Sequence, residues 1–74
     1  MAHIRWKLRA CRVQAGYTQA EAAKLLGISE STLINYETGK SAANMEIGQK
    51  MSDLYQIPIE VMDFTKVGNS LIKD

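Results

Sequence analysis

The sequence is poor in the residues that build disulfide scaffolds, metal centres and most catalytic sites. Its 74 residues include one cysteine, one histidine and one proline. The single cysteine, Cys11, excludes an internal disulfide, and with only His3 to accompany it the chain has too few ligands for a closed zinc site. No pattern of paired carboxylates, Ser/His/Asp or Cys/His residues indicates a catalytic centre, and no phosphate-binding loop of the form G-x-x-x-x-G-K-S/T occurs. We therefore expect no enzyme activity, no metal site, no cofactor and no small-molecule ligand.

Long hydrophobic runs are also absent. The longest apolar stretches fall far short of the roughly 20 residues that a membrane-spanning helix needs. No basic-then-apolar leader opens the sequence. We expect a cytoplasmic protein with no membrane partner, folded as one small domain. A core of that size is only marginally stable unless good helix packing or a partner chain supports it.

Charge is nearly balanced overall but unevenly distributed. The formal net charge is +1, which is small for a protein that binds nucleic acid. Residues 1–40 carry six Lys/Arg and three acidic residues, whereas residues 41–74 carry three lysines and five acidic residues. A surface that binds phosphates would therefore belong to the first half of the chain, and its salt dependence should be modest.

Residues 18–40 form the most informative stretch, and they predict two short helices joined by a tight turn. Thr18 and Glu21 have the T-x-x-E spacing of a capping box, which opens a helix over residues 18–26. The apolar residues of this helix recur at helical spacing: Ala22, Leu25 and Leu26. Gly27 then ends the helix, because glycine adopts a left-handed conformation at little cost.

The second helix of this stretch covers residues 29–38 and has two unlike faces. Ser29 is a suitable cap, and Leu33 and Tyr36 lie three residues apart on the inner face. The opposite face is short and polar apart from one isoleucine: Glu30, Ser31, Ile34, Asn35 and Thr38. A helix with one buried and one short polar face suits insertion into a DNA major groove, which is wide enough for one helix.

This stretch resembles the helix-turn-helix of the phage repressor and Cro family, often called the XRE family. The matching residues fall in register without a gap: Gln19, Ala23, Gly27, Ile28, Leu33 and Tyr36, followed by the ending Tyr36-Glu37-Thr38-Gly39-Lys40. The resemblance covers residues 4–64. It implies an all-α fold, a compact bundle of four to five short helices like the DNA-binding domain of lambda repressor, in which residues 29–38 form the recognition helix.

The other expected helices cover residues 3–15, 44–55 and 58–63. In the first, apolar residues recur at i, i+4, i+7 and i+11 from Ile4 onward, with Cys11 as a small buried hydrophobe. Trp6 lies off this stripe and either covers the edge of the core or serves an interface. Gly48 departs from the family, which usually has a large apolar residue there, and leaves space that Trp6 or a methionine can fill. We assign residues 1–64 to the domain, while the tail, 65–74, is either disordered or part of a dimer contact.

The resemblance also implies which residues contact DNA. The phosphate contacts, made from the start of the first motif helix and from the loop after the second, fall on Thr18, Gln19, Ser29, Lys40 and Ser41, with Ser29 serving mainly as a helix cap. The base contacts fall on Glu30, Ser31, Ile34 and Asn35. For each residue taken alone, the alternative is a solvated polar surface.

Two structural roles follow from the same resemblance. Arg12 is expected to pair with Glu37 and so to tie the first helix to the recognition helix; the alternative is a solvated Arg12. The residues expected at a two-fold dimer contact are Ile57, Ile59, Val61, Met62 and Phe64. The alternative is that all five only complete the core.

The function expected from this resemblance is transcription regulation by a sequence-specific DNA-binding protein. We expect a bacterial or phage-encoded repressor that binds double-stranded DNA at an inverted-repeat operator as a homodimer. One alternative is a protein-interaction module on the same fold, which the low net charge and Glu30 favour. Another is an antitoxin or restriction-control regulator, which would share the same DNA chemistry.

Overall fold

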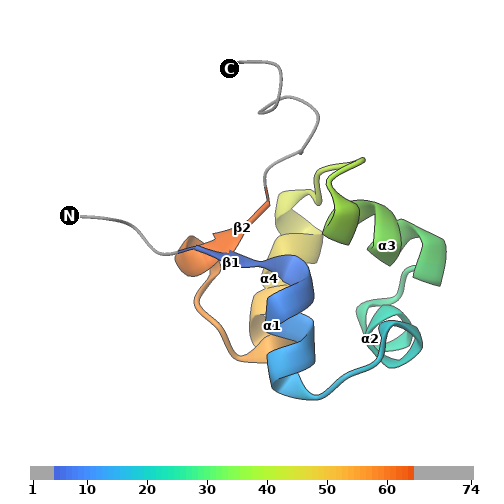
Figure 1. The fold of residues 1–74 in the computed structure, drawn as a ribbon, viewed down its shortest axis with the longest axis horizontal. Coiled ribbons are helices and arrows are strands. Elements are labelled where there is room, and N and C mark those ends of the chain that lie inside the picture. Colours follow the sequence, from blue (N-terminus) through green and yellow to red (C-terminus); the bar gives the residue numbers. More distant parts are fainter. Residues whose placement is uncertain (1–4, 65–74) are drawn as a thin grey trace.

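The computed structural model describes residues 5–64; residues 1–4 and 65–74 lie outside the described part of the chain. The expectations for Ile4 and for the tail over 65–74 therefore fall outside it. The elements in order are β1 (Trp6–Lys7), α1 (Leu8–Ala15), α2 (Gln19–Leu26), α3 (Glu30–Thr38), α4 (Met45–Tyr55), the 3-10 turn η1 (Ile59–Val61) and β2 (Met62–Asp63) (Figure 1).

The four α-helices surround one small core. Figure 1 shows α2 and α3 together on one side of the molecule and the β1–β2 pair on the other, with α1 and α4 packed against each other between them. The buried apolar residues come from all four helices and β2: Leu8, Cys11, Ala22, Ala23, Leu26, Leu33, Met51, Tyr55 and Met62. The all-α bundle expected from the sequence is confirmed, with a minimal strand pair added. No helix within residues 5–64 is long and apolar enough to cross a bilayer.

Capping residues set the helix boundaries, as the sequence predicts. At the start of α2 the Thr18 hydroxyl accepts from the Glu21 N–H at 3.1 Å, and the Glu21 carboxylate accepts from the Thr18 N–H at 2.9 Å. Ser29 caps α3 through the Thr32 N–H, and Asn44 caps α4. Gly27 ends α2 in the left-handed region with φ of 78°, a conformation that costs glycine little.

The small side chain of Ala23, one of the residues that match the family, is buried in the core. Ala23 is 3% exposed and packs in the core with Leu26 and Leu33. Leu25, in contrast, is 59% exposed, so its expected place on the inner stripe of the helix is wrong. The inner face of α2 consists of Ala22, Ala23 and Leu26 instead, because Leu26 lies four and three residues after the two alanines and so on the same side of the helix.

Two helices are shorter than the sequence predicts, because residues at their ends pair with each other as β-strands. The helix expected over 3–15 begins only at Leu8, and the helix expected over 58–63 is reduced to the three-residue turn η1. The residues released from these helices form the parallel strands β1 and β2, in which Trp6 pairs with Met62 and Lys7 with Asp63. The Lys7 ammonium also contacts the Asp63 carboxylate at 3.0 Å. A long-range pairing of this kind cannot be read from local periodicity.

Gly48 provides the space expected of it, but other side chains fill that space. A Cβ atom at Gly48 would lie 3.3 Å from Cζ of Phe64 and 3.6 Å from Cδ1 of Ile59. The expectation that Trp6 or a methionine fills the gap is therefore wrong. Trp6 lies on β1, and 39% of it is exposed. This partial exposure does not decide between the two roles expected of Trp6, at the edge of the core or at an interface.

Gln56 is the only non-glycine residue in the described part of the chain with a positive φ, 58°, and it ends α4. Glycine relieves the steric cost of this conformation, so we expect Gln56→Gly to raise the free energy of unfolding by about 0.5–1 kcal/mol in urea denaturation. The matched control is Gln49→Gly, inside α4, which should lower it by about 1 kcal/mol. A loss of stability in Gln56→Gly would contradict this account.

Candidate nucleic-acid interface

The outer face of α3 presents the residues that the sequence predicts as base contacts. Glu30 and Ser31 are exposed, Ile34 is 36% exposed, and Asn35 is half-buried. On the inner side of the same helix Leu33 is fully buried. Glu30 lies in the first turn of α3, where the positive end of the helix dipole stabilises its charge. The four residues form one continuous surface because they lie at i, i+1, i+4 and i+5 of a helix.

The predicted phosphate contacts lie at the two ends of the motif. Gln19 is the first residue of α2, where backbone N–H groups have no acceptor within the helix. Lys40 and Ser41 follow α3, and their backbone N–H groups donate to the Asn35 carbonyl at 3.0 and 3.2 Å. This closes the end of α3 and leaves both side chains exposed.

Two of the predicted phosphate contacts are already engaged as helix caps. The Thr18 hydroxyl serves the capping box of α2. The Ser29 hydroxyl accepts from the Thr32 N–H at 3.1 Å and donates to the Thr32 hydroxyl at 2.8 Å. The Ser29 hydroxyl proton is therefore occupied, whereas the Thr18 hydroxyl only accepts in its cap and keeps its O–H as a donor for a phosphate oxygen.

Arg12 and Glu37 form the ion pair that the sequence predicts. Nε of Arg12 donates to Oε2 of Glu37 at 2.7 Å, and Nη2 donates to Oε1 at 3.3 Å. Only 8% of the Arg12 side chain and 2% of the Glu37 side chain are exposed. A bidentate, buried pair of this kind fixes both distance and orientation, so it holds α1 and α3 in a defined relation.

The pair also holds the start of α2, which sequence reasoning missed. Nη1 of Arg12 donates to the Tyr17 carbonyl at 2.8 Å, just before α2 begins. Oε1 of Glu37 accepts from the Gln19 side-chain amide at 3.2 Å. One carboxylate therefore receives hydrogen bonds from both α1 and α2. The only sequence signal for this contact is a long polar residue at the first position of α2.

Tyr55 lies at the core side of the same cluster. It is 4% exposed, and its hydroxyl has no hydrogen-bond partner within the described part of the chain. Burial raises the pKa of Tyr55 to about 12, with a further contribution from the negative charge of Glu37 and an opposing one from Arg12. The phenol is thus neutral at physiological pH and packs against Tyr17, with ring centroids 6.4 Å apart.

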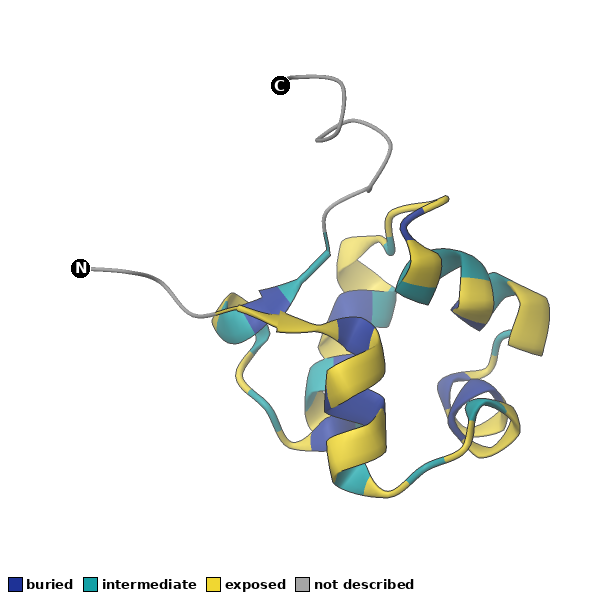
Figure 2. Cartoon of the chain, viewed as in Figure 1, coloured by how far each residue is buried: buried dark blue, intermediate teal, exposed yellow. Residues whose placement is uncertain are grey.

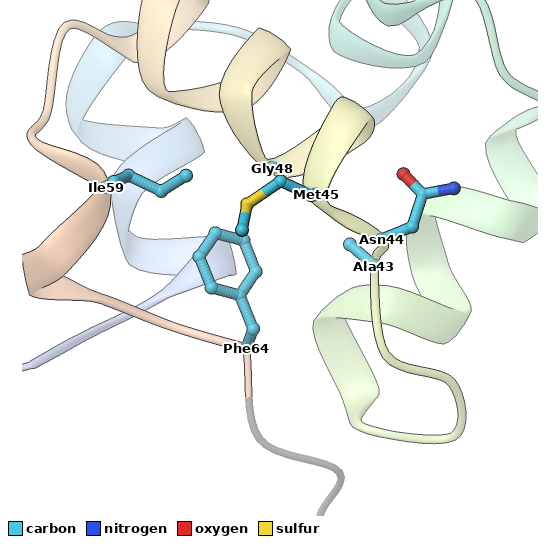
Figure 3. Close-up of a pocket in the computed structure, with 6 residues that line it drawn as sticks. All are labelled: Ala43, Asn44, Met45, Gly48, Ile59 and Phe64. Atoms are coloured by element: carbon cyan, nitrogen blue, oxygen red, sulfur yellow. The ribbon is translucent and has the colours of Figure 1, made fainter.

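The residues predicted at a dimer contact divide into two groups. Met62 is 1% exposed and belongs to the core, so it offers no surface to a partner. Ile57, Ile59, Val61 and Phe64 are half-buried. Ile59 and Phe64 line an apolar cleft of about 220 Å³ together with Gly48 and Met45 (Figure 3). Met45, which the prediction omitted, is 79% exposed at the mouth of this cleft.

No group of three or more potential metal-ligating side chains occurs among residues 5–64. Cys11 is fully buried, and burial raises the pKa of its thiol. It therefore packs as a small hydrophobic residue, as expected from the sequence.

Comparisons with known proteins match the region that carries this geometry. A family model described as "Helix-turn-helix" matches residues 8–62, from the start of α1 to the first residue of β2. The chain is 38% identical over 52 residues to a protein of Thermococcus gammatolerans, and 36% identical over 53 residues to one of Pyrococcus horikoshii. Both are named "Putative HTH-type transcriptional regulatory protein".

These relatives are much longer than this chain. The matches cover 70% and 72% of this chain but 16% and 17% of the two relatives, so the chain spans about one sixth of their length. A protein of Saccharolobus islandicus with the same type of name is 35% identical over 48 residues, which is 65% of this chain and 16% of that protein. All three organisms are archaea, so the comparisons do not support the expected bacterial or phage origin. No solved structure matches the chain.

Removing one partner of the buried pair should destabilise the domain strongly. We expect Arg12→Met or Glu37→Leu alone to lower the free energy of unfolding by about 3–5 kcal/mol, because each leaves a buried charge unpaired. The double variant Arg12→Met/Glu37→Leu should recover most of this loss, because it leaves no uncompensated charge. Urea denaturation of the three variants checks this. Single variants as stable as the parent would show that the pair contributes no structural constraint.

Proposed function

This chain belongs to the helix-turn-helix family, and from that premise we propose that it is a sequence-specific DNA-binding transcription regulator. In this proposal it binds an inverted-repeat operator as a homodimer, with α3 in the major groove. It acts as a repressor in the cytoplasm, because a protein seated on an operator blocks other proteins from the same site.

The main support for the proposal is that buried contacts hold α3 in place while its polar face stays exposed. Leu33 anchors α3 in the core, and the Arg12–Glu37 pair clamps its C-terminal half. Glu30 and Ser31 remain exposed on the opposite side. A major groove about 12 Å wide admits such a helix. Because α3 is held before binding, its side chains meet base edges with little loss of conformational entropy.

Phosphate contacts at both ends of the motif would fix the register of α3 on the duplex. The first N–H groups of α2, at Gln19, offer a positive helix terminus to one phosphate. Lys40 and Ser41 offer a charged and a hydroxyl group to another. The bond from Gln19 to Glu37 orients the Gln19 side chain relative to α3. The first phosphate contact and the base contacts are thereby held in one rigid unit.

The side chains on the outer face of α3 offer different base contacts. The Asn35 amide can pair with N6 and N7 of adenine, and the Ser31 hydroxyl can donate or accept. The Ile34 side chain can contact a thymine methyl group, and the Glu30 carboxylate can accept from N4 of cytosine. This mixture of groups supports sequence-specific binding. Purely electrostatic binding is less suitable, because the net charge of the chain is only +1.

The apolar cleft supports the homodimer. Met45 is the most exposed large hydrophobic residue of the described chain, and it lies beside the half-buried Ile59 and Phe64. Figure 3 shows the Met45 side chain reaching across toward the Phe64 ring. A second copy that covers this surface would remove apolar area from water, which favours association. A two-fold operator requires a dimer that presents two copies of α3 to one duplex.

Replacing a base contact should weaken binding and change specificity at one base pair. We expect Ser31→Ala and Asn35→Ala each to cost about 1–3 kcal/mol of binding free energy and to relax the preference at one position of each half-site. The measurement is selection from a randomised duplex pool at two salt concentrations, followed by sequencing of the bound fraction. The parent protein should enrich a palindrome with half-sites about one helical turn apart.

Replacing a phosphate contact should act differently. Lys40→Ala should weaken binding to all sequences alike and reduce the slope of log K against log salt by about 1. The matched control is Lys50→Ala, an exposed lysine on α4, which should change neither quantity. If the parent protein enriches no sequence, or if Lys40→Ala and Lys50→Ala behave alike, the proposed interface is wrong.

A charge in the apolar cleft should prevent dimerisation. Met45 is 79% exposed, so Met45→Glu should leave the fold intact and raise the dimer dissociation constant at least tenfold in sedimentation equilibrium. Leu25→Glu places the same charge at an exposed leucine on α2, away from the cleft, and should have no such effect. A parent protein that stays monomeric at all concentrations would contradict the dimer.

A further inference from the structure

A second open groove, which shares no residue with the cleft at Gly48, runs along α1 and β1. Its volume is about 660 Å³, and the side chains that define it include Trp6, Lys7, Arg9, Ala10 and Val13. In Figure 2, β1 is coloured as exposed, and exposed residues alternate with buried ones along α1. None of these residues takes part in the proposed contacts with DNA or in the cleft at Gly48.

The groove has an apolar floor where a solvated helix face would normally be polar. The buried face of α1 consists of Leu8, Cys11 and Arg12. Val13 points away from that face and is 54% exposed, and Trp6 beside it is 39% exposed. Both belong to the five exposed large hydrophobic residues of the described chain, so two of the five converge on this one groove.

The rim of the groove is positively charged. Arg9 is exposed and forms no ion pair within residues 5–64, and Lys7 keeps 71% of its side chain exposed although it contacts Asp63. Arg5, also exposed, precedes Trp6 directly. The one acidic residue lining the groove, Glu37, has its charge matched by Arg12. The charge of Lys7 is likewise matched by Asp63, so Arg9 is the uncompensated charge among the lining residues, and it favours a negatively charged ligand.

We propose that this groove docks an acidic segment of a partner protein, one that places an aromatic or aliphatic side chain on the floor between Trp6 and Val13. Tryptophan and arginine are the residues that most often dominate binding energy at protein interfaces. The acidic side chains of the segment pair with Arg9 and Lys7, while the apolar anchor covers the floor. A DNA backbone would use the two cations but leave the apolar floor uncovered, which favours the protein ligand.

This inference does not depend on DNA binding, since the groove shares no residue with the proposed base and phosphate contacts. It gives the domain a second binding surface, through which a partner protein could be recruited or could control the regulator. Failure of either proposal leaves the other intact.

The test uses a displayed library of random peptides, selected on the full chain. The groove variant is Arg9→Glu/Val13→Ser, and the matched control is Lys50→Glu/Leu25→Ser, which makes comparable changes at exposed positions of α4 and α2. Trp6 is the only tryptophan of the chain, so its fluorescence reports directly on the groove when synthetic peptides without tryptophan are titrated. Circular dichroism establishes that each variant is folded, and Arg9→Ala serves as a milder second variant.

The expected result is enrichment of peptides that combine Asp or Glu with an aromatic or aliphatic residue. Their binding should shift the Trp6 fluorescence, weaken at least tenfold in the groove variant, weaken to a lesser extent in Arg9→Ala, and stay unchanged in the control. No enrichment, enrichment of basic peptides, or equal binding by the groove and control variants would overturn the proposal. A further pair of results would also overturn it: random duplex DNA displaces the peptides, and Arg9→Ala binds DNA more weakly. The groove would then belong to the phosphate-binding surface.

Discussion

The buried pair of Arg12 and Glu37 is the constraint on which the rest of the structure depends. Its carboxylate is 2% exposed and receives hydrogen bonds from Arg12 on α1 and from Gln19 on α2, while it belongs to α3. A charge buried to this degree must be matched in place, since leaving it unpaired costs several kcal/mol. Small movements of the helices relative to one another would break the match. The pair therefore converts three short helices, each marginal in isolation, into one rigid body.

Rigidity of this kind explains how so small a domain can present a defined recognition surface. The core is small, and α2 contributes two alanines to it beside Leu26. The polar clamp at Glu37 holds the C-terminal half of α3. Leu33, the buried residue of α3, sets the rotation of the helix about its own axis. The direction in which Glu30, Ser31 and Ile34 face is thus decided by buried residues that never touch a ligand.

The outer face of α3, the cleft beside Gly48 and the groove along α1 share no residue, although Glu37 of α3 lines the groove. The face of α3 is polar, the cleft is apolar, and the groove joins apolar residues with positive charge. These differences are the basis of the three proposed partners: bases and phosphates, a second copy of the chain, and an acidic protein segment. Because α1 pairs with α3 through Arg12, the groove and the recognition helix are mechanically connected.

The sequence by itself determined the features that local chemistry controls. The capping box at Thr18, the cap at Ser29 and the turn at Gly27 follow from residues close to one another in the chain, and so do the polar positions of α3. The Arg12–Glu37 contact was accessible only through the family resemblance. Tertiary structure alone decided the rest: the pairing of Trp6–Lys7 with Met62–Asp63 that shortens two expected helices, the exposure of Leu25, the filling of Gly48 by Phe64, and the bond from Gln19 to Glu37. The physical reason is that periodicity and capping report on neighbours within about one helical turn, whereas these contacts join residues distant in sequence and exist only once the helices have packed.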